Sequence, residues 1–121
     1  MDIPVTDSIT ISELKYHFSS VFPNLKLEFF TKRHRPNRHS NLKFLAKDST
    51  VFGDHRQNPF TSEIVIRPTM TVNELEQSFG EIYGLGVQVF RQSDGLWLET
   101  VITDDWTLQT QNEKGKTSSN V

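Results

Sequence analysis

One short pattern occurs twice in this chain, 61 residues apart, and it is typical of a helix N-terminus. Residues 9–14 and 70–75 both read apolar, Thr, Ile or Val, Ser or Asn, Glu, Leu. With Thr10 or Thr71 as the N-cap, the glutamate three residues later can close a capping box, and the flanking apolar residues can form a hydrophobic staple. The pattern therefore predicts two helices that begin in the same way, over about 11–22 and 72–83.

The segments around these helix starts alternate apolar and polar side chains, which is the pattern of half-buried strands. Residues 1–8 are expected to be irregular or to form a short strand, because Pro4 blocks a helix there. A short helix or turn is predicted over about 104–111, where Thr103 can cap acidic residues. Strands are predicted over residues 25–30 and 42–45 in the first half of the chain, and over 61–66, 87–90 and 96–100 in the second half.

The order of these elements predicts one α+β domain. Each helix is followed by a hairpin, so the chain contains two helix–strand–strand units, at about 9–48 and 62–112. The matched caps indicate an internal duplication. One unit buries too little apolar surface to be stable alone, so both are expected to share one core. We therefore expect a single domain over 1–112, with two helices on one face of a mixed sheet of about five strands, and a flexible tail at 113–121.

Residues 62–112 resemble part of a ubiquitin-like β-grasp domain. The resemblance lies in a strand at 63–66, in the helix start Thr71-Val72-x-Glu74-Leu75, and in the late turn Thr103-Asp104-Asp105-x-Thr107-Leu108. It implies a partly β-grasp-like fold. The sequence has no terminal Gly-Gly, so conjugation to a target protein is not expected. The whole chain is also similar to small uncharacterised bacterial proteins with the same helix and hairpin, and this similarity implies no activity.

Composition argues against several classes of function. The chain contains no cysteine, which excludes disulfides and thiolate chemistry. It has no run of 18 apolar residues and no visible secretory signal, so we expect a cytoplasmic protein without a membrane partner. The four histidines lack the spacing of a zinc site, and neither a Gly-rich phosphate loop nor a nucleophile elbow is present. We therefore expect no metal, cofactor or catalytic residue, with an enzyme of unidentified class as an alternative.

A basic segment lies at residues 32–43, with no acidic residue between Glu28 and Asp48. Its position between two predicted strands would place it at a hairpin tip. Such a cluster could neutralise phosphates, bind an acidic protein partner or the acidic second half of the chain, or form a plain solvated loop. The candidate anion-binding residues are Lys32, Arg33, Arg35, Arg38 and Lys43.

Aromatic side chains in the second hairpin form another candidate site. Trp97 alternates with Leu96 and Leu98, so it faces the opposite side of its strand. If the leucines face the core, Trp97 lies on the outer face, where an exposed tryptophan is a candidate hot spot for a partner. Alternatively, other segments cover this face and place Trp97 in a second core layer. The candidate partner-binding residues are Phe90, Trp97, Glu99 and Trp106.

These observations favour a non-catalytic protein–protein interaction module or adaptor. Its partner is unidentified. A homodimer is one option, because residues 1–61 carry nine basic and six acidic side chains whereas residues 62–121 carry four and nine. The alternative function is binding of nucleic acid or another anionic ligand through residues 32–43.

Overall fold

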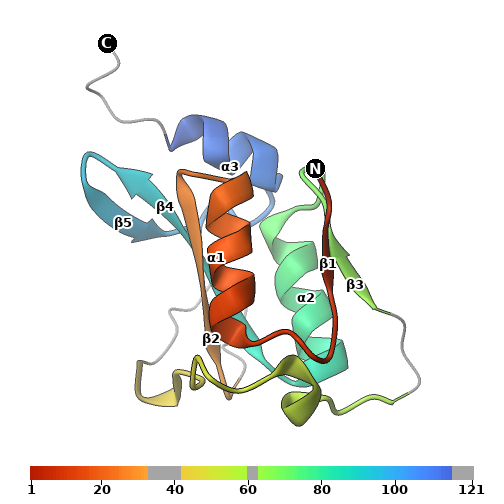
Figure 1. Ribbon diagram of the computed structural model, residues 1–121. Helices are drawn as coiled ribbons and strands as arrows, with labels where there is room; N and C mark the ends of the chain where they lie inside the picture. The colour runs from red at the N-terminus through yellow and green to blue at the C-terminus, as the bar shows by residue number, and fades with distance from the viewer. Residues whose placement is uncertain (33–41, 60–62, 116–121) are drawn as a thin grey trace.

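The computed structural model describes residues 1–32, 42–59 and 63–115 (Figure 1). These residues form both helices and strands, which confirms the predicted α+β class. The α-helices are α1 (Ile11–Val21), α2 (Val72–Tyr83) and α3 (Leu108–Lys114). The strands are β1 (Ile3–Val5), β2 (Leu25–Phe30), β3 (Ile64–Ile66), β4 (Gly86–Ser93) and β5 (Leu96–Glu99), and short 3₁₀ helices cover Leu42–Phe44 and Phe52–His55.

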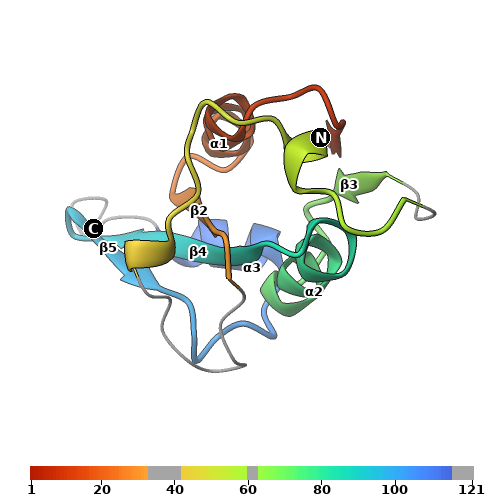
Figure 2. The ribbon, with the colours of Figure 1, turned by 90° about the horizontal axis from the view of Figure 1, so that it is seen from below.

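The described strands form two antiparallel sheets, so the expectation of one mixed five-stranded sheet is wrong. β1 pairs with β3, with Pro4 opposite Val65, and the other sheet has the order β2-β4-β5, with Leu27 opposite Val89. α1 and α2 each contact the strand before and the strand after them in the chain: α1 packs on β1 and β2, and α2 packs on β3 and β4 (Figures 1 and 2). The two strands that flank α1 belong to different sheets, and so do the two strands that flank α2.

The described part of the first half contains no hairpin, contrary to the prediction for residues 42–45. Leu42–Phe44 form a 3₁₀ turn, and Leu45 makes a single bridge to Phe30. The alternation of apolar and polar residues is misleading at this point, because Leu42 and Leu45 are both exposed and the pattern buries no apolar face. Within the described residues the two halves therefore differ here, since the hairpin lies in the second half.

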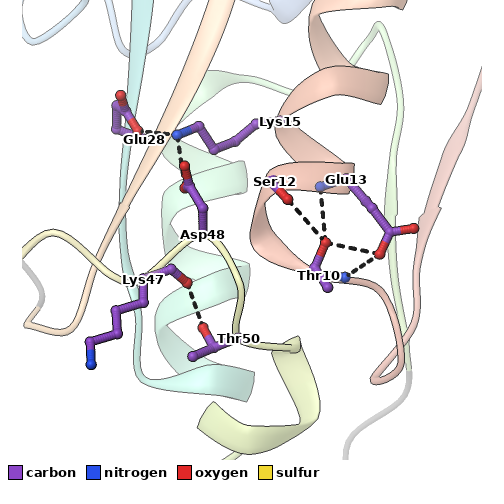
Figure 3. A network of polar contacts seen from close by, with 8 residues as sticks. All are labelled: Thr10, Ser12, Glu13, Lys15, Glu28, Lys47, Asp48 and Thr50. Carbon is purple, nitrogen blue, oxygen red and sulfur yellow. Dashed lines mark hydrogen bonds and ion pairs between the residues drawn. The ribbon is translucent and has the colours of Figure 1, made fainter.

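The starts of α1 and α2 are built as predicted. In α1, Glu13 N donates to Thr10 Oγ1 at 3.1 Å, and Thr10 N donates to Glu13 Oε1 at 3.0 Å, which completes the capping box (Figure 3). In α2, the same two bonds join Thr71 and Glu74 at 3.1 Å each. α2 ends before Gly84, whose φ of 66° provides a left-handed C-cap. The limits of α2 match those predicted from the sequence.

A later segment of the same half is hydrogen-bonded to the start of α1, and another to the start of α2. Two backbone carbonyls of each segment accept from the first two amides of the helix, which satisfies donors that have no partner within the helix. In α1 the arrangement is reinforced by Lys15 Nζ, which donates to Glu28 Oε1 at 2.6 Å and to Asp48 Oδ1 at 3.1 Å (Figure 3). The four backbone bonds run from Ile11 N to Thr50 O, Ser12 N to Asp48 O, Val72 N to Trp106 O and Asn73 N to Asp104 O, at 3.0, 3.1, 3.1 and 2.7 Å.

The same later segments then enter the core. Phe52 N donates to Ile9 O at 3.1 Å, and Leu108 N donates to Met70 O at 2.8 Å. The side chains of Phe52 and Leu108 are fully buried. Phe52 lies between the strands predicted at 42–45 and 61–66, where neither a helix nor a strand is predicted, but this residue is central. The centroid of its ring lies within 5.6 Å of the ring centroids of Phe29, Phe79 and Tyr83.

α3 begins later than the predicted helix over 104–111, because Thr107 caps it instead of Thr103. Thr110 N donates to Thr107 Oγ1 at 3.1 Å. The helix continues to Lys114, two residues past the expected domain limit at 112, and residues 116–121 of the expected tail lie outside the described residues. No helix in the described part of the chain is both long and apolar enough to cross a membrane.

Candidate functional site

Phe90, Trp97 and Glu99 share the outer face of the three-stranded sheet. Phe90 lies opposite Glu99 in the β4–β5 register, and Trp97 lies two residues from Glu99 on the same face. The other face of the sheet carries Leu27 and Val89, which are buried in the core. The structure therefore brings together three of the four predicted partner-binding residues.

Lys26 of β2 completes this cluster. It lies opposite Phe90 in the β2–β4 register, and its Nζ lies 5.1 Å from the ring centroid of Phe90 and 5.1 Å from that of Trp97. Such an ammonium group is held by cation–π attraction. Among residues 1–32, 42–59 and 63–115, no carboxylate lies within ion-pair distance of it. The result is an aromatic surface with a positive charge above it.

β5 is exposed on both faces, so its leucines do not face the core and Trp97 does not lie in a second core layer. Leu96 is 66% exposed, Leu98 is 44% exposed and Trp97 is 39% exposed. β5 is the last strand of its sheet, and it pairs with the second half of β4, where β4 itself is only half-buried. A tight turn with φ values of 50° at Asp94 and 85° at Gly95 joins the two strands. Figure 1 shows this hairpin at the side of the molecule, away from α2.

Trp106, the fourth predicted residue, lies apart from this cluster. The guanidinium carbon of Arg91 lies 5.5 Å from the ring centroid of Trp106, and Arg91 Nη1 donates to Gln111 Oε1 at 2.8 Å. The buried Gln111 donates through Nε2 to the carbonyl and hydroxyl oxygens of Thr103 at 2.7 and 2.8 Å. Trp106 therefore belongs to a polar network that fixes α3 against β4.

Two of the five predicted anion-binding residues, Lys32 and Lys43, lie within the described part of the chain. Their Nζ atoms approach the same ring, at 4.7 and 5.0 Å from the ring centroid of Phe44. The ends of the basic segment are therefore close together. The remaining three residues, Arg33, Arg35 and Arg38, lie outside the described residues.

An open groove of about 690 Å³ lies between α1 and α3, and sequence analysis missed it. Apolar side chains of Phe22 and Pro68 line it together with the polar side chains of His17, Asn112 and Glu113. Its volume is in the range of small-molecule sites. These residues come from three separate segments and share no motif, so no sequence signal could have found the groove.

A cluster of titratable side chains joins the start of the chain to α2. Arg56 Nε donates to both carboxylate oxygens of Asp7 at 3.1 and 3.0 Å, and Tyr83 Oη donates to Asp7 Oδ1 at 2.9 Å. The hydrogen bond from Arg56, and after it the bond from Tyr83, holds the pKa of Asp7 below its ordinary value. Burial, together with the bond to Asp7, raises the pKa of Tyr83 to about 12. The three groups face one another, so we assign this cluster to stability.

A scan against protein-family models, a search of curated proteins and a search of solved structures each found no match. Within the described residues, no group of three or more His, Asp or Glu side chains is arranged to hold a metal ion.

Proposed function

We propose that this protein is a cytoplasmic, non-catalytic interaction module that binds another protein through the β4–β5 hairpin. The observation that carries the proposal is the exposure of three consecutive apolar side chains, Leu96, Trp97 and Leu98, on an edge strand. Soluble proteins usually cover or charge such edges, because an exposed apolar edge associates with other chains. Lys26, held over the rings of Phe90 and Trp97, adds a charge that can orient the partner.

The polar clusters of the described residues support the non-catalytic part of this proposal. Lys15 joins α1 to Glu28 of β2 and to Asp48 of the segment that returns to the helix start. The Asp7 cluster joins the first loop to α2. A catalytic group must face a place where substrate can be held. These side chains instead face each other, and their contacts explain their positions.

The test is capture of partners from the native host with hairpin variants and a matched control. Leu98 and Leu45 are each 44% exposed, and both lie at edges of the three-stranded sheet. We expect Leu98→Ser and Trp97→Ala each to reduce capture about tenfold, because hot-spot residues dominate binding. Leu45→Ser should leave capture unchanged. Full capture by a variant that combines Trp97→Ala, Phe90→Ala and Leu98→Ser, with folding verified by circular dichroism, would refute the proposed function.

We also propose that the two halves derive from duplication of one partly ubiquitin-like unit. The matched capping boxes support this, as do the matched bonds from later segments and the pairing of β1 with β3 and of β2 with β4. If the units are equivalent, the start of α1 should accept the residues of α2. A variant with Ile11→Val and Ser12→Asn should keep its unfolding free energy to within about 0.5 to 1 kcal/mol. A larger loss in urea denaturation would count against equivalence.

A second candidate function is binding of nucleic acid or another anionic ligand through the basic segment. The observation that favours it is the approach of Lys32 and Lys43 to one ring, that of Phe44, which brings the ends of this segment together. Filter binding of single-stranded DNA at low and at physiological salt tests it. Retention should fall steeply with salt, because phosphate contacts release counterions. No retention at low salt would dispose of this alternative.

A further inference from the structure

We propose that the partner of the β4–β5 hairpin binds as an extended segment that adds a strand to the open edge of β5. Its apolar side chains lie beside Leu96 and Leu98, and one of its carboxylates lies beside Lys26. This inference rests on the proposed function and specifies the mode of binding and the chemistry of the partner.

The backbone of β5 directs alternate groups to its open edge. Thr100 N donates to Val89 O at 3.2 Å, and hydrogen-bonded pairs recur at every second position of an antiparallel ladder. Leu98 and Leu96 therefore bond to β4, whereas the N–H and C=O of Trp97 point away from it. Because β5 ends the strand order β2-β4-β5 among the described residues, a further strand can pair there.

The side chains of β5 indicate what an added strand should carry. Successive side chains of a strand point to opposite faces of the sheet. On one face, the added strand would lie beside the exposed Leu96 and Leu98, so apolar side chains are favoured at alternate positions. On the other face it would lie beside Trp97 and the ammonium group of Lys26.

Lys26 determines the charge of the partner. Its ammonium group contacts the rings of Phe90 and Trp97 and has no carboxylate within ion-pair distance among the described residues. A carboxylate on the added strand at the level of Trp97 would be attracted to it, and an ammonium there would be repelled. Lys26 is held over the ring of Trp97, so the acidic position of the added strand is the one at the level of that ring.

The size of the apolar surface favours a short segment over a second copy of the chain. Leu96, Trp97 and Leu98 are three exposed residues, whereas each partner of a stable protein–protein interface buries about 800 Å² over about 20–30 residues. A strand added to an edge gains main-chain hydrogen bonds and needs only shallow contacts for its alternate side chains. The exposed surface of β5 matches that mode.

Titration with two synthetic peptides tests the charge. The probe is the acetylated, amidated heptapeptide Val-Thr-Val-Glu-Val-Thr-Val, and the comparison peptide has lysine in place of glutamate. At low salt we expect the glutamate peptide to bind about fivefold more tightly and to shift the backbone amide resonances of residues 95–99. Lys26→Gln should remove the difference. Equal affinities, or no saturable shift in β5, would overturn the inference.

Backbone methylation of the glutamate peptide separates strand addition from docking of side chains. One form carries N-methyl groups on the valines, and the other carries them on the threonines and the glutamate. Only one edge of an added strand faces β5, so one form should lose at least tenfold in affinity while the other retains binding. Equal affinities of the two methylated peptides would overturn strand addition. Both peptides are titrated against the parent protein.

The outcomes distinguish this inference from the proposed function. If capture of the partner depends on Trp97 and Leu98 but both methylated peptides bind equally, the proposed function stands and strand addition is wrong. If the chain sediments as a dimer that Trp97→Ala dissociates, the occupant is a second copy, and the inference is overturned. A monomeric protein that binds one methylated peptide at least tenfold more tightly than the other supports strand addition.

Discussion

At the scale of single residues, Asp7, Arg56 and Tyr83 show how side chains far apart in sequence hold the domain together. Arg56 donates hydrogen bonds to both carboxylate oxygens of Asp7, and Tyr83 of α2 donates a further one. Because the pKa of Asp7 is lowered in the folded state, its contribution to stability is present above about pH 4 and is lost as the pH falls below that value. Tyr83 has the opposite dependence.

We expect the stability of the protein to fall as the pH rises from about 10 through about 12. The pKa of Tyr83 is about 12 in the folded state against an ordinary value of 10.0, so the folded chain holds the phenolic proton more tightly than the unfolded chain does. This contribution is complete below the unfolded value and is lost as the pH passes through the folded value. Urea denaturation at several alkaline pH values should show a steeper decline for the parent than for Tyr83→Phe. Parallel declines would contradict this assignment.

The N-cap of α2 provides a prediction with a close control. Thr71 accepts from the amide of Glu74, so Thr71→Ala should lower the free energy of unfolding by about 0.5–2 kcal/mol. Thr69→Ala changes an exposed threonine two residues earlier and should have little effect. Partner binding should be unchanged in both variants. Loss of the partner from Thr71→Ala at unchanged stability would show that the helix start has a functional role.

At the scale of elements, the ends of α2 are determined by two local devices, the capping box and Gly84. Gly84 has a φ of 66°, and a Cβ at this position would collide with the side chain of Gln57. Gly95 also has a positive φ, 85°, but space around it is open. Both glycines therefore share the cost that a left-handed backbone would impose on a residue with a Cβ.

Gly84→Ala and Gly95→Ala should each destabilise the protein by about 1–2 kcal/mol, because a residue with a Cβ pays this cost in the left-handed conformation. At Gly84 the added Cβ would meet only the end of the exposed, flexible side chain of Gln57, which can move aside. Combining Gly84→Ala with Gln57→Ala should therefore restore little stability. Chemical denaturation of the single and double variants measures these losses. A loss at Gly84 well above that at Gly95, restored by Gln57→Ala, would mean that Gln57 is held in place.

At the scale of the whole molecule, the two halves are joined through both sheets and through the aromatic core. β1 pairs with β3 and β2 pairs with β4, so each sheet contains strands from both halves. Phe52 packs its ring against Phe79 and Tyr83 of the other half. The core is therefore shared, as the sequence led us to expect.

Phe52→Ala tests this view of the core. The residue is fully buried, so its truncation should cost about 3–5 kcal/mol through lost burial and a cavity. Phe44→Ala, at a half-buried ring nearby in sequence, should cost clearly less. Urea denaturation followed by tryptophan fluorescence measures both. Comparable losses would contradict the central position of Phe52.

Features that depend on a few neighbouring residues could be predicted from the sequence. The capping boxes of Thr10 and Thr71 and the end of α2 at Tyr83 are of this kind. So is the phase of β5, which places Trp97 on the face of Phe90 and Glu99. Each depends on interactions within about four residues or on the period of a strand, and such information is present in the local pattern.

The tertiary structure alone decided which distant backbones pair. Leu42–Phe44 alternate like a strand but form a turn, and Phe52 lies in a polar stretch but reaches the core, because contacts with other segments outweigh weak local preferences. The candidate site depends on the same kind of choice. A local pattern predicts that Trp97 and Leu98 face opposite sides of β5. It cannot show that β5 is the last strand of its sheet, beyond the cover of the helices, and that position is what exposes both faces.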